Sequence, residues 1–96
     1  MGAKIKGLGH TIPKKKIPNQ FFIDQGLNTS DEWIKERTGI ETRYFTPDET
    51  GSSDLGYEAA LDCLKNTNTD ISEIDLILVA TSTPDHNAFP STACLI

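Results

Sequence analysis

Residues 29–40 read TSDEWIKERTGI, and they say more about the structure than any other segment of the 96-residue sequence. Thr29 and Glu32 have the spacing of a capping box, in which each side chain satisfies a backbone N–H group of the other residue. The acidic residues at the start of the segment favour the positive end of a helix dipole. Gly39 is the type of residue at which helices commonly end. We therefore predict a helix that begins at Thr29 and stops at Gly39.

Trp33 and Arg37 stand four residues apart, so they share one face of that predicted helix. An indole ring and a guanidinium group placed in this way can hold a nucleotide, by stacking and by charge-assisted contacts to phosphate. A more ordinary interpretation is an intrahelical cation–π pair that covers surface. The spacing alone favours the ordinary interpretation and leaves the nucleotide-binding one open.

On the N-terminal side of this helix, alternating apolar residues predict a short strand at residues 4–9 that runs into a loop. The basic run Lys14 to Lys16 lies between Pro13 and Pro18, and we interpret it as a solvated part of that loop. A small helix is expected to begin at Asn19 and to close at residue 26, which is a glycine.

On the C-terminal side, residues 40–45 predict a weak strand, and the next helix is expected to be capped by Ser52 or Ser53 and to continue to about Lys65. A short turn should follow at residues 70–73. Residues 76–80 read LILVA, and such continuous apolarity is typical of a strand buried on both faces of a sheet. A final helix should begin at Pro90, a residue type that suits the first turn.

Composition excludes several classes of protein. The net charge of −5 and the pI of about 4.8 argue against a nucleic-acid-binding protein, which must neutralise phosphates with clustered Lys and Arg. The longest apolar stretch is far shorter than the roughly 20 residues of a membrane-spanning helix. The N-terminus has no apolar signal-peptide core, so we expect a soluble protein in the reducing cytoplasm.

The reactive side-chain types do not form a recognisable catalytic or metal-binding pattern. Cys63 lies on the apolar stripe of the long helix, and Cys94 has apolar neighbours, so we interpret both as packing residues. His10 and His86 have no partner at zinc-ligand spacing, and we interpret both as loop residues. We therefore expect no metal site.

Several segments occur in an order that resembles the N-terminal part of β-ketoacyl-acyl-carrier-protein synthase III, and they extend over essentially the whole chain. The segments are TSDEWI at 29–34, RTGI at 37–40, SDLGYEAA at 53–60, IDLI at 74–77, VAT at 79–81 and FPSTAC at 89–94. Together they form a specific match.

The resemblance implies an α/β protein with the thiolase-like fold, a layered α/β/α/β/α arrangement built from two similar halves. Residues 1–96 would form only the first part of the N-terminal half, with the C-terminal half absent. The resemblance further implies that Trp33 stacks on the adenine of coenzyme A, that Thr29 contacts the same nucleotide and that Arg37 helps to hold the coenzyme. Phe89 resembles the family residue that crosses the homodimer interface and lines the partner's acyl pocket, although an ordinary aromatic residue of the interface core is an equal alternative.

The activity implied by the resemblance is a decarboxylative Claisen condensation that initiates fatty-acid synthesis. Acetyl-coenzyme A and malonyl-acyl carrier protein would give acetoacetyl-carrier protein, carbon dioxide and free coenzyme A. The catalytic Cys, His and Asn of the family would lie beyond residue 96, and Cys94 does not occupy the nucleophile's position. We therefore expect no catalytic residue in this chain, and no cofactor, because the coenzyme A thioester is a substrate.

Two alternatives remain open. The same fold could serve a specialised starter-unit or secondary-metabolite condensing enzyme. From another class, the chain could be a non-catalytic coenzyme A-binding or interaction domain that is complete in 96 residues.

Overall fold

The computed structural model describes residues 2–96 and divides the chain into two compact units. One unit is Pro13–Pro47, and the other combines the segment before it with Asp48–Ile96. Their charges differ. Pro13–Pro47 carries six Lys and Arg against five Asp and Glu, a net charge of +1, whereas the rest of the chain carries three against nine, a net charge of −6.

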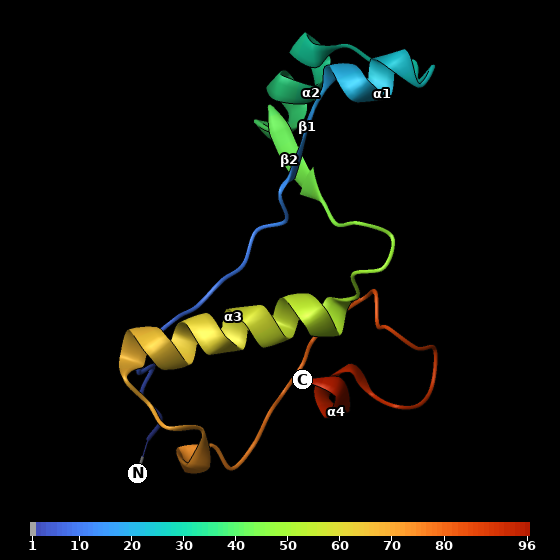
Figure 1. Ribbon diagram of the computed structural model, residues 1–96. Coiled ribbons are helices and arrows are strands. Elements are labelled where there is room, and N and C mark those ends of the chain that lie inside the picture. Colours follow the sequence, from blue (N-terminus) through green and yellow to red (C-terminus); the bar gives the residue numbers. More distant parts are fainter. Residues whose placement is uncertain (1) are drawn as a thin grey trace. The chain divides into compact units, whose positions relative to one another are not determined.

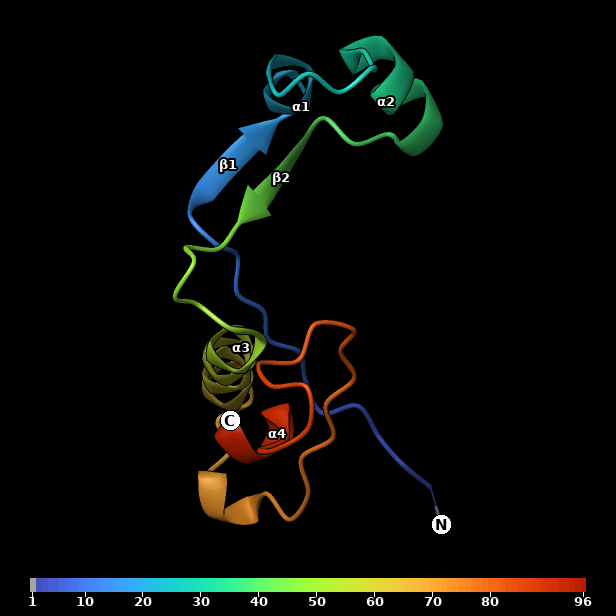
Figure 2. The same cartoon turned by 90° about the vertical axis from the view of Figure 1, so that its right-hand side faces the viewer.

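The unit Pro13–Pro47 is a two-stranded ribbon with two short helices between its strands in the sequence. Strands β1 (Lys15–Pro18) and β2 (Thr42–Phe45) pair antiparallel, and Ile17 lies opposite Arg43. Helices α1 (Gln20–Asp24) and α2 (Asp31–Thr38) follow β1 and precede β2 (Figures 1 and 2). The ribbon brings together the segments immediately before α1 and after α2.

A small core supports this ribbon. Ile17 is 4% exposed, and Phe21, Phe22 and Phe45 form an edge-to-face aromatic cluster with ring centroids 5.4–6.3 Å apart. The guanidinium of Arg43 lies 4.7 Å from the centroid of the Phe22 ring, at cation–π distance. Aromatic and cation–π contacts therefore replace a larger aliphatic core in this unit.

The lysine run corrects one prediction. Lys15 and Lys16 belong to β1, where they lie opposite Phe45 and Tyr44, so this part of the chain is a strand rather than a loop. All three lysine side chains are exposed, as expected. A strand at the edge of a two-stranded ribbon can carry lysines because its side chains remain in water.

In the other unit, the long helix α3 (Ser52–Thr67) is followed by the 3-10 turn η1 (Ile71–Glu73) and by the one-turn helix α4 (Thr92–Leu95) (Figure 1). The residue that caps α3 is Gly51, not Ser52 or Ser53 as predicted. Asp54, in the first turn of α3, accepts a hydrogen bond from the Gly51 N–H at 2.8 Å. The backbone N–H of the N-cap residue is therefore hydrogen-bonded.

The two serines have a different role, because they tie the segment before α4 to the start of α3. The Ser52 hydroxyl donates to the carbonyl oxygen of Thr83. Asp85 accepts from both the N–H and the hydroxyl of Ser53, at 2.9 and 2.8 Å. The hydrogen bond from the Ser53 hydroxyl is the main cause that lowers the pKa of Asp85, and the bond from the Ser53 N–H acts in the same direction.

Residues 4–9 do not form the predicted strand. They run without regular structure beside α3, where the His10 N–H donates to Asp62 at 3.0 Å and the Thr11 hydroxyl donates to Glu58 at 2.8 Å. A Cβ at Gly9 would overlap the carbonyl oxygen of Ala59 and the backbone nitrogen of Cys63. Only glycine lets the segment approach the helix backbone this closely.

Residues 76–80 also depart from the prediction of a strand buried on both faces. They form no strand, and Leu76 and Leu78 are 73% and 85% exposed. A strand needs a neighbour for its backbone hydrogen bonds, and within residues 2–96 the only paired strands are β1 and β2. The apolar pattern still indicates a surface that favours burial. Within residues 2–96, Leu76 and Leu78 stay largely uncovered, whereas Ile77 and Val79 are 48% and 38% exposed.

Within residues 2–96, no helix is both long and apolar enough to cross a membrane.

Candidate functional site

Helix α2 begins one residue later than the predicted capping box. Ser30 is the N-cap residue, in an extended conformation, and its Oγ accepts a hydrogen bond from the Trp33 N–H at 3.1 Å. The predicted pair of Thr29 and Glu32 is therefore wrong. The hydroxyl of Ser30, and not that of Thr29, accepts from a backbone N–H in the first turn of the helix.

The predicted end of α2 is confirmed. Gly39 adopts the left-handed conformation, with φ of 70°, and its N–H donates to the carbonyl oxygen of Lys35 at 2.8 Å. The hydroxyl of Thr38 donates back to the carbonyl oxygen of Ile34 at 2.7 Å and accepts from the Ile40 N–H at 3.1 Å. The last turn of α2 is thus closed by local hydrogen bonds.

The structure brings Trp33 and Arg37 together on α2. The central carbon of the Arg37 guanidinium lies 5.8 Å from the centroid of the Trp33 ring, and Trp33 is 54% exposed. We call this pair the Trp33–Arg37 shelf. It offers an accessible aromatic face beside a permanent positive charge, which is the combination needed to stack a base and to contact a phosphate.

Thr29 lies immediately before the N-cap, in the same unit as the shelf. Its hydroxyl oxygen is buried and makes no hydrogen bond to any residue that the structure describes. A buried hydroxyl without a partner is costly, because the hydrogen bonds that it would make to water are not replaced. Phe89 belongs to the other unit, where it is 90% exposed, and it takes no part in the shelf.

Further side chains position α2. Lys35 and Asp31 form an ion pair at 2.8 Å, four residues apart on the helix. The hydrogen bond from Lys35, followed by one from Asn19 at 2.8 Å, holds the pKa of Asp31 below its ordinary value.

The role of Asn19 could not be predicted from the sequence, because an asparagine at a helix start is normally interpreted as a local cap. Its partners lie 12 to 24 residues away, and no local pattern reveals them.

The cysteines and histidines offer no comparable site. Cys63 is partly buried on α3, but Cys94 is exposed rather than packed, because α4 has a single turn and little chain covers it. His10 and His86 are exposed loop residues, as predicted. No group of three or more His, Cys, Asp or Glu side chains within residues 2–96 is arranged to hold a metal ion.

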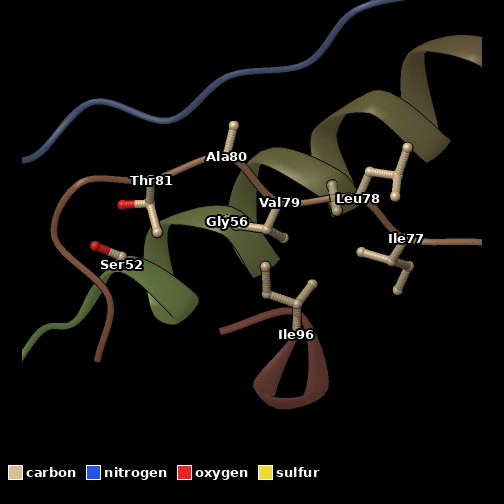
Figure 3. Close-up of a pocket in the computed structure, with 9 residues that line it drawn as sticks. Ser52, Gly56, Ile77, Leu78, Val79, Ala80, Thr81 and Ile96 are labelled. Atoms are coloured by element: carbon tan, nitrogen blue, oxygen red, sulfur yellow. The ribbon is translucent and has the colours of Figure 1, made fainter. Parts of the chain in front are cut away.

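In the unit that contains α3, a cavity of about 400 Å³ lies between that helix, residues 77–81 and Ile96 (Figure 3). Ser52 and Thr81 contribute hydroxyl groups near one end, as the close-up shows, and Ile77, Val79 and Ile96 line other parts of the wall. None of its lining residues is ionisable. The cavity can accept apolar groups, but its walls contain no acid or base to act on them.

Curated relatives match the chain over its full length. Beta-ketoacyl-[acyl-carrier-protein] synthase III of Geobacillus kaustophilus (strain HTA426) is 47% identical over 96 residues, which are 100% of this chain and 30% of the relative. The protein of the same name from Paracoccus denitrificans (strain Pd 1222) is 45% identical over 94 residues, which are 98% of this chain and 28% of the relative. The chain thus spans less than a third of these relatives. No protein-family model matches it.

Solved structures agree with these relatives. The crystal structure of 3-oxoacyl-[acyl-carrier-protein] synthase III from Aquifex aeolicus VF5 superposes with a TM-score of 0.85 at 44% identity, covering 98% of this chain and 30% of that one. The priming β-ketosynthase of the R1128 polyketide biosynthetic pathway gives a TM-score of 0.83 at 26% identity, covering 96% and 27%. The expected thiolase-like fold class is confirmed for the part of the fold that the chain spans. Along its whole length, this chain is therefore homologous to the N-terminal part of the β-ketoacyl-[acyl-carrier-protein] synthase III family.

Proposed function

We propose that the full-length protein containing this segment is a condensing acyltransferase that initiates fatty-acid synthesis. It joins acetyl-coenzyme A to malonyl-acyl carrier protein and releases carbon dioxide and coenzyme A. The observation that carries the proposal is the Trp33–Arg37 shelf, formed within a segment that is 47% identical to a named β-ketoacyl-carrier-protein synthase III. Residues 1–96 contribute part of the N-terminal half domain, and none of them is proposed as a catalytic residue.

The role proposed for the shelf is to hold the nucleotide end of the thioester. Trp33 stacks on the adenine ring, Arg37 contacts a phosphate, and the Thr29 hydroxyl binds a polar group of the same nucleotide. The charge of the unit supports this role, since Pro13–Pro47 has a net charge of +1 within an acidic chain. A positively charged unit attracts an anionic ligand that the rest of the chain repels.

Phe89 is proposed to serve a second copy of the protein. Its 90% exposure fits a side chain that is buried only in an assembly, and we propose that it lines the acyl pocket of the partner subunit in a homodimer. The proposed location is the cytoplasm, where coenzyme A thioesters and carrier protein serve as substrates.

Alanine variants of the shelf test this function in the full-length protein. Base stacking on an aromatic side chain contributes about 1–3 kcal/mol, so Trp33→Ala should weaken acetyl-coenzyme A binding by about fivefold or more. Arg37→Ala should weaken it by a similar factor through the lost charge-assisted contact. Calorimetric titration measures both effects, and Glu36→Ala, an exposed change on the same helix, is the matched control. Unchanged affinity in the double variant would remove the proposed site.

A specialised condensing enzyme is the second candidate, and the structural match to the R1128 priming β-ketosynthase favours it. Both candidates use the same shelf, because both act on a coenzyme A thioester. They differ in the acyl group. Comparing kcat/KM for acetyl-coenzyme A with that for longer or branched acyl-coenzyme A thioesters separates them, since a fatty-acid initiator with the proposed substrate should prefer acetyl.

A further inference from the structure

Asn19 is the most deeply buried polar residue that the structure describes, at 1% exposure, and every polar group of its side chain is hydrogen-bonded. Its Nδ2 donates to Asp31 Oδ1 and to the carbonyl oxygen of Ile40, both at 2.8 Å. Its Oδ1 accepts from Arg43 Nη2 at 2.5 Å. A buried amide whose nitrogen and oxygen are both hydrogen-bonded in this way has only one favourable orientation.

The partners of Nδ2 lie at the two ends of α2. Asp31 is the first residue of the helix, and Ile40 follows its C-cap, Gly39. One amide group therefore holds both the entry and the exit of the helix that carries Trp33 and Arg37. No other buried side chain is linked to both ends of α2 in the part of the chain that the structure describes.

Within residues 2–96, packing contributes little to this task, because none of the eight residues of α2 is buried. A helix without a buried apolar face depends on contacts at its ends for a defined position. The hydrogen bonds at Asp31 and Ile40 supply that definition.

Arg43 fixes the orientation of the amide. Its guanidinium donates to Asn19 Oδ1 and, at 3.4 Å, to the carbonyl oxygen of Ile17, while it lies over the Phe22 ring. Because Arg43 can only donate, the oxygen of the amide must face it and the NH₂ group must face Asp31 and Ile40. Asn19 is thus the residue through which Arg43 of the ribbon is linked to both ends of α2.

We propose that Asn19 is a positioning residue for coenzyme A binding, which holds α2 at both ends so that Trp33 and Arg37 are preorganised to receive the nucleotide. The inference rests on the proposed function of the shelf. A site held in its binding conformation loses less free energy when the ligand is bound than one that must be ordered first. Removing Asn19 should therefore weaken nucleotide recognition without touching the acyl chemistry.

The test compares two substrates in the full-length synthase. Acetyl-coenzyme A carries the nucleotide, whereas acetyl-pantetheine presents the same thioester without it. Asn19→Ala should raise KM for acetyl-coenzyme A by about tenfold with little change in kcat, because positioning defects of this size act through binding. Its kcat/KM for acetyl-pantetheine should stay at the wild-type value. Gln20→Ala, at the exposed neighbouring position, is the control and should change neither.

A reciprocal exchange keeps the test decisive if Asn19→Ala folds poorly. Asn19→Asp is nearly isosteric but places a second carboxylate against Asp31, so it should raise KM for acetyl-coenzyme A. Adding Asp31→Asn restores a donor and an acceptor to that contact and should recover part of the loss. Recovery specific to acetyl-coenzyme A supports positioning, whereas equal losses for both substrates in all these variants would overturn it.

The two hypotheses fail in different ways. If Trp33→Ala and Arg37→Ala weaken acetyl-coenzyme A binding but Asn19 variants do not, the shelf is correct and the role of Asn19 is wrong. If none of these variants discriminates between the two substrates, the proposed function of the shelf itself fails.

Discussion

Ser30 starts α2 with a single hydroxyl, which accepts from the N–H of Trp33. Because this contact both caps the helix and fixes the backbone of a shelf residue, Ser30→Ala should lower the free energy of unfolding by about 1 kcal/mol. Denaturant titration of the full-length protein measures the loss. Ser82→Ala, at an exposed position outside any helix, is the control. An unchanged midpoint for Ser30→Ala would show that the cap contributes nothing.

Asp31 gives the same helix a pH dependence with a defined sign. Hydrogen bonds from Lys35 and then Asn19 lower its pKa, so the folded state favours the charged carboxylate. The resulting stabilisation is complete above the unfolded-state pKa, about 4, and is lost as the pH falls through the lower folded-state value. An NMR titration of the Asp31 carboxyl carbon should show the low pKa. Lys35→Met should move it upward, and an Asp31 that titrates at the ordinary value would contradict the network.

Residue-level prediction succeeds where the chemistry is local. The four-residue spacing of Trp33 and Arg37 is enough to place them on one helix face, and the contact between them is observed. It fails for Asn19, whose hydrogen bonds depend on the ribbon that brings distant segments together. The ligand-binding roles proposed for Trp33, Arg37 and Thr29, and the role proposed for Phe89, remain predictions.

At the scale of elements, the close approach of residues 7–11 to α3 depends on the absence of a side chain at Gly9. A methyl group at Gly9 would overlap the backbone of Ala59 and Cys63, and a helix backbone cannot yield as a flexible side chain can. Gly9→Ala should therefore lower the free energy of unfolding by about 1–3 kcal/mol. Gly2→Ala, where nothing lies within 4 Å, is the matched control in the same measurement. Equal stability of the two variants would contradict the observed packing.

Helices are predicted better than strands for a physical reason. The hydrogen bonds of α2 and α3 lie within each helix, so capping residues and periodicity identify them, with errors of one or two residues at the ends. A strand is defined by its partner. Residues 4–9 and 76–80 have strand-like patterns but no partner in the described chain, whereas β1 has an unpromising lysine-rich sequence but pairs with β2.

For the molecule as a whole, the uncovered apolar side chains predict association. Leu76 and Leu78 lie in an extended segment, and Phe89 is almost fully exposed. An apolar surface of this kind favours contact with another chain over contact with water. The isolated 96-residue chain should therefore self-associate with increasing concentration in sedimentation velocity, and Leu78→Lys should reduce the effect. A monomer at every concentration would instead favour the alternative of a complete, independent domain.

The sequence contains one tryptophan, and the structure places it at the candidate ligand site, half exposed beside Arg37. The tryptophan fluorescence of this chain therefore comes from Trp33 alone. A stacked adenine should dim the emission, while pantetheine, which has no base, should leave it unchanged. The intrinsic fluorescence of the 96-residue chain should thus follow nucleotide binding without an added label.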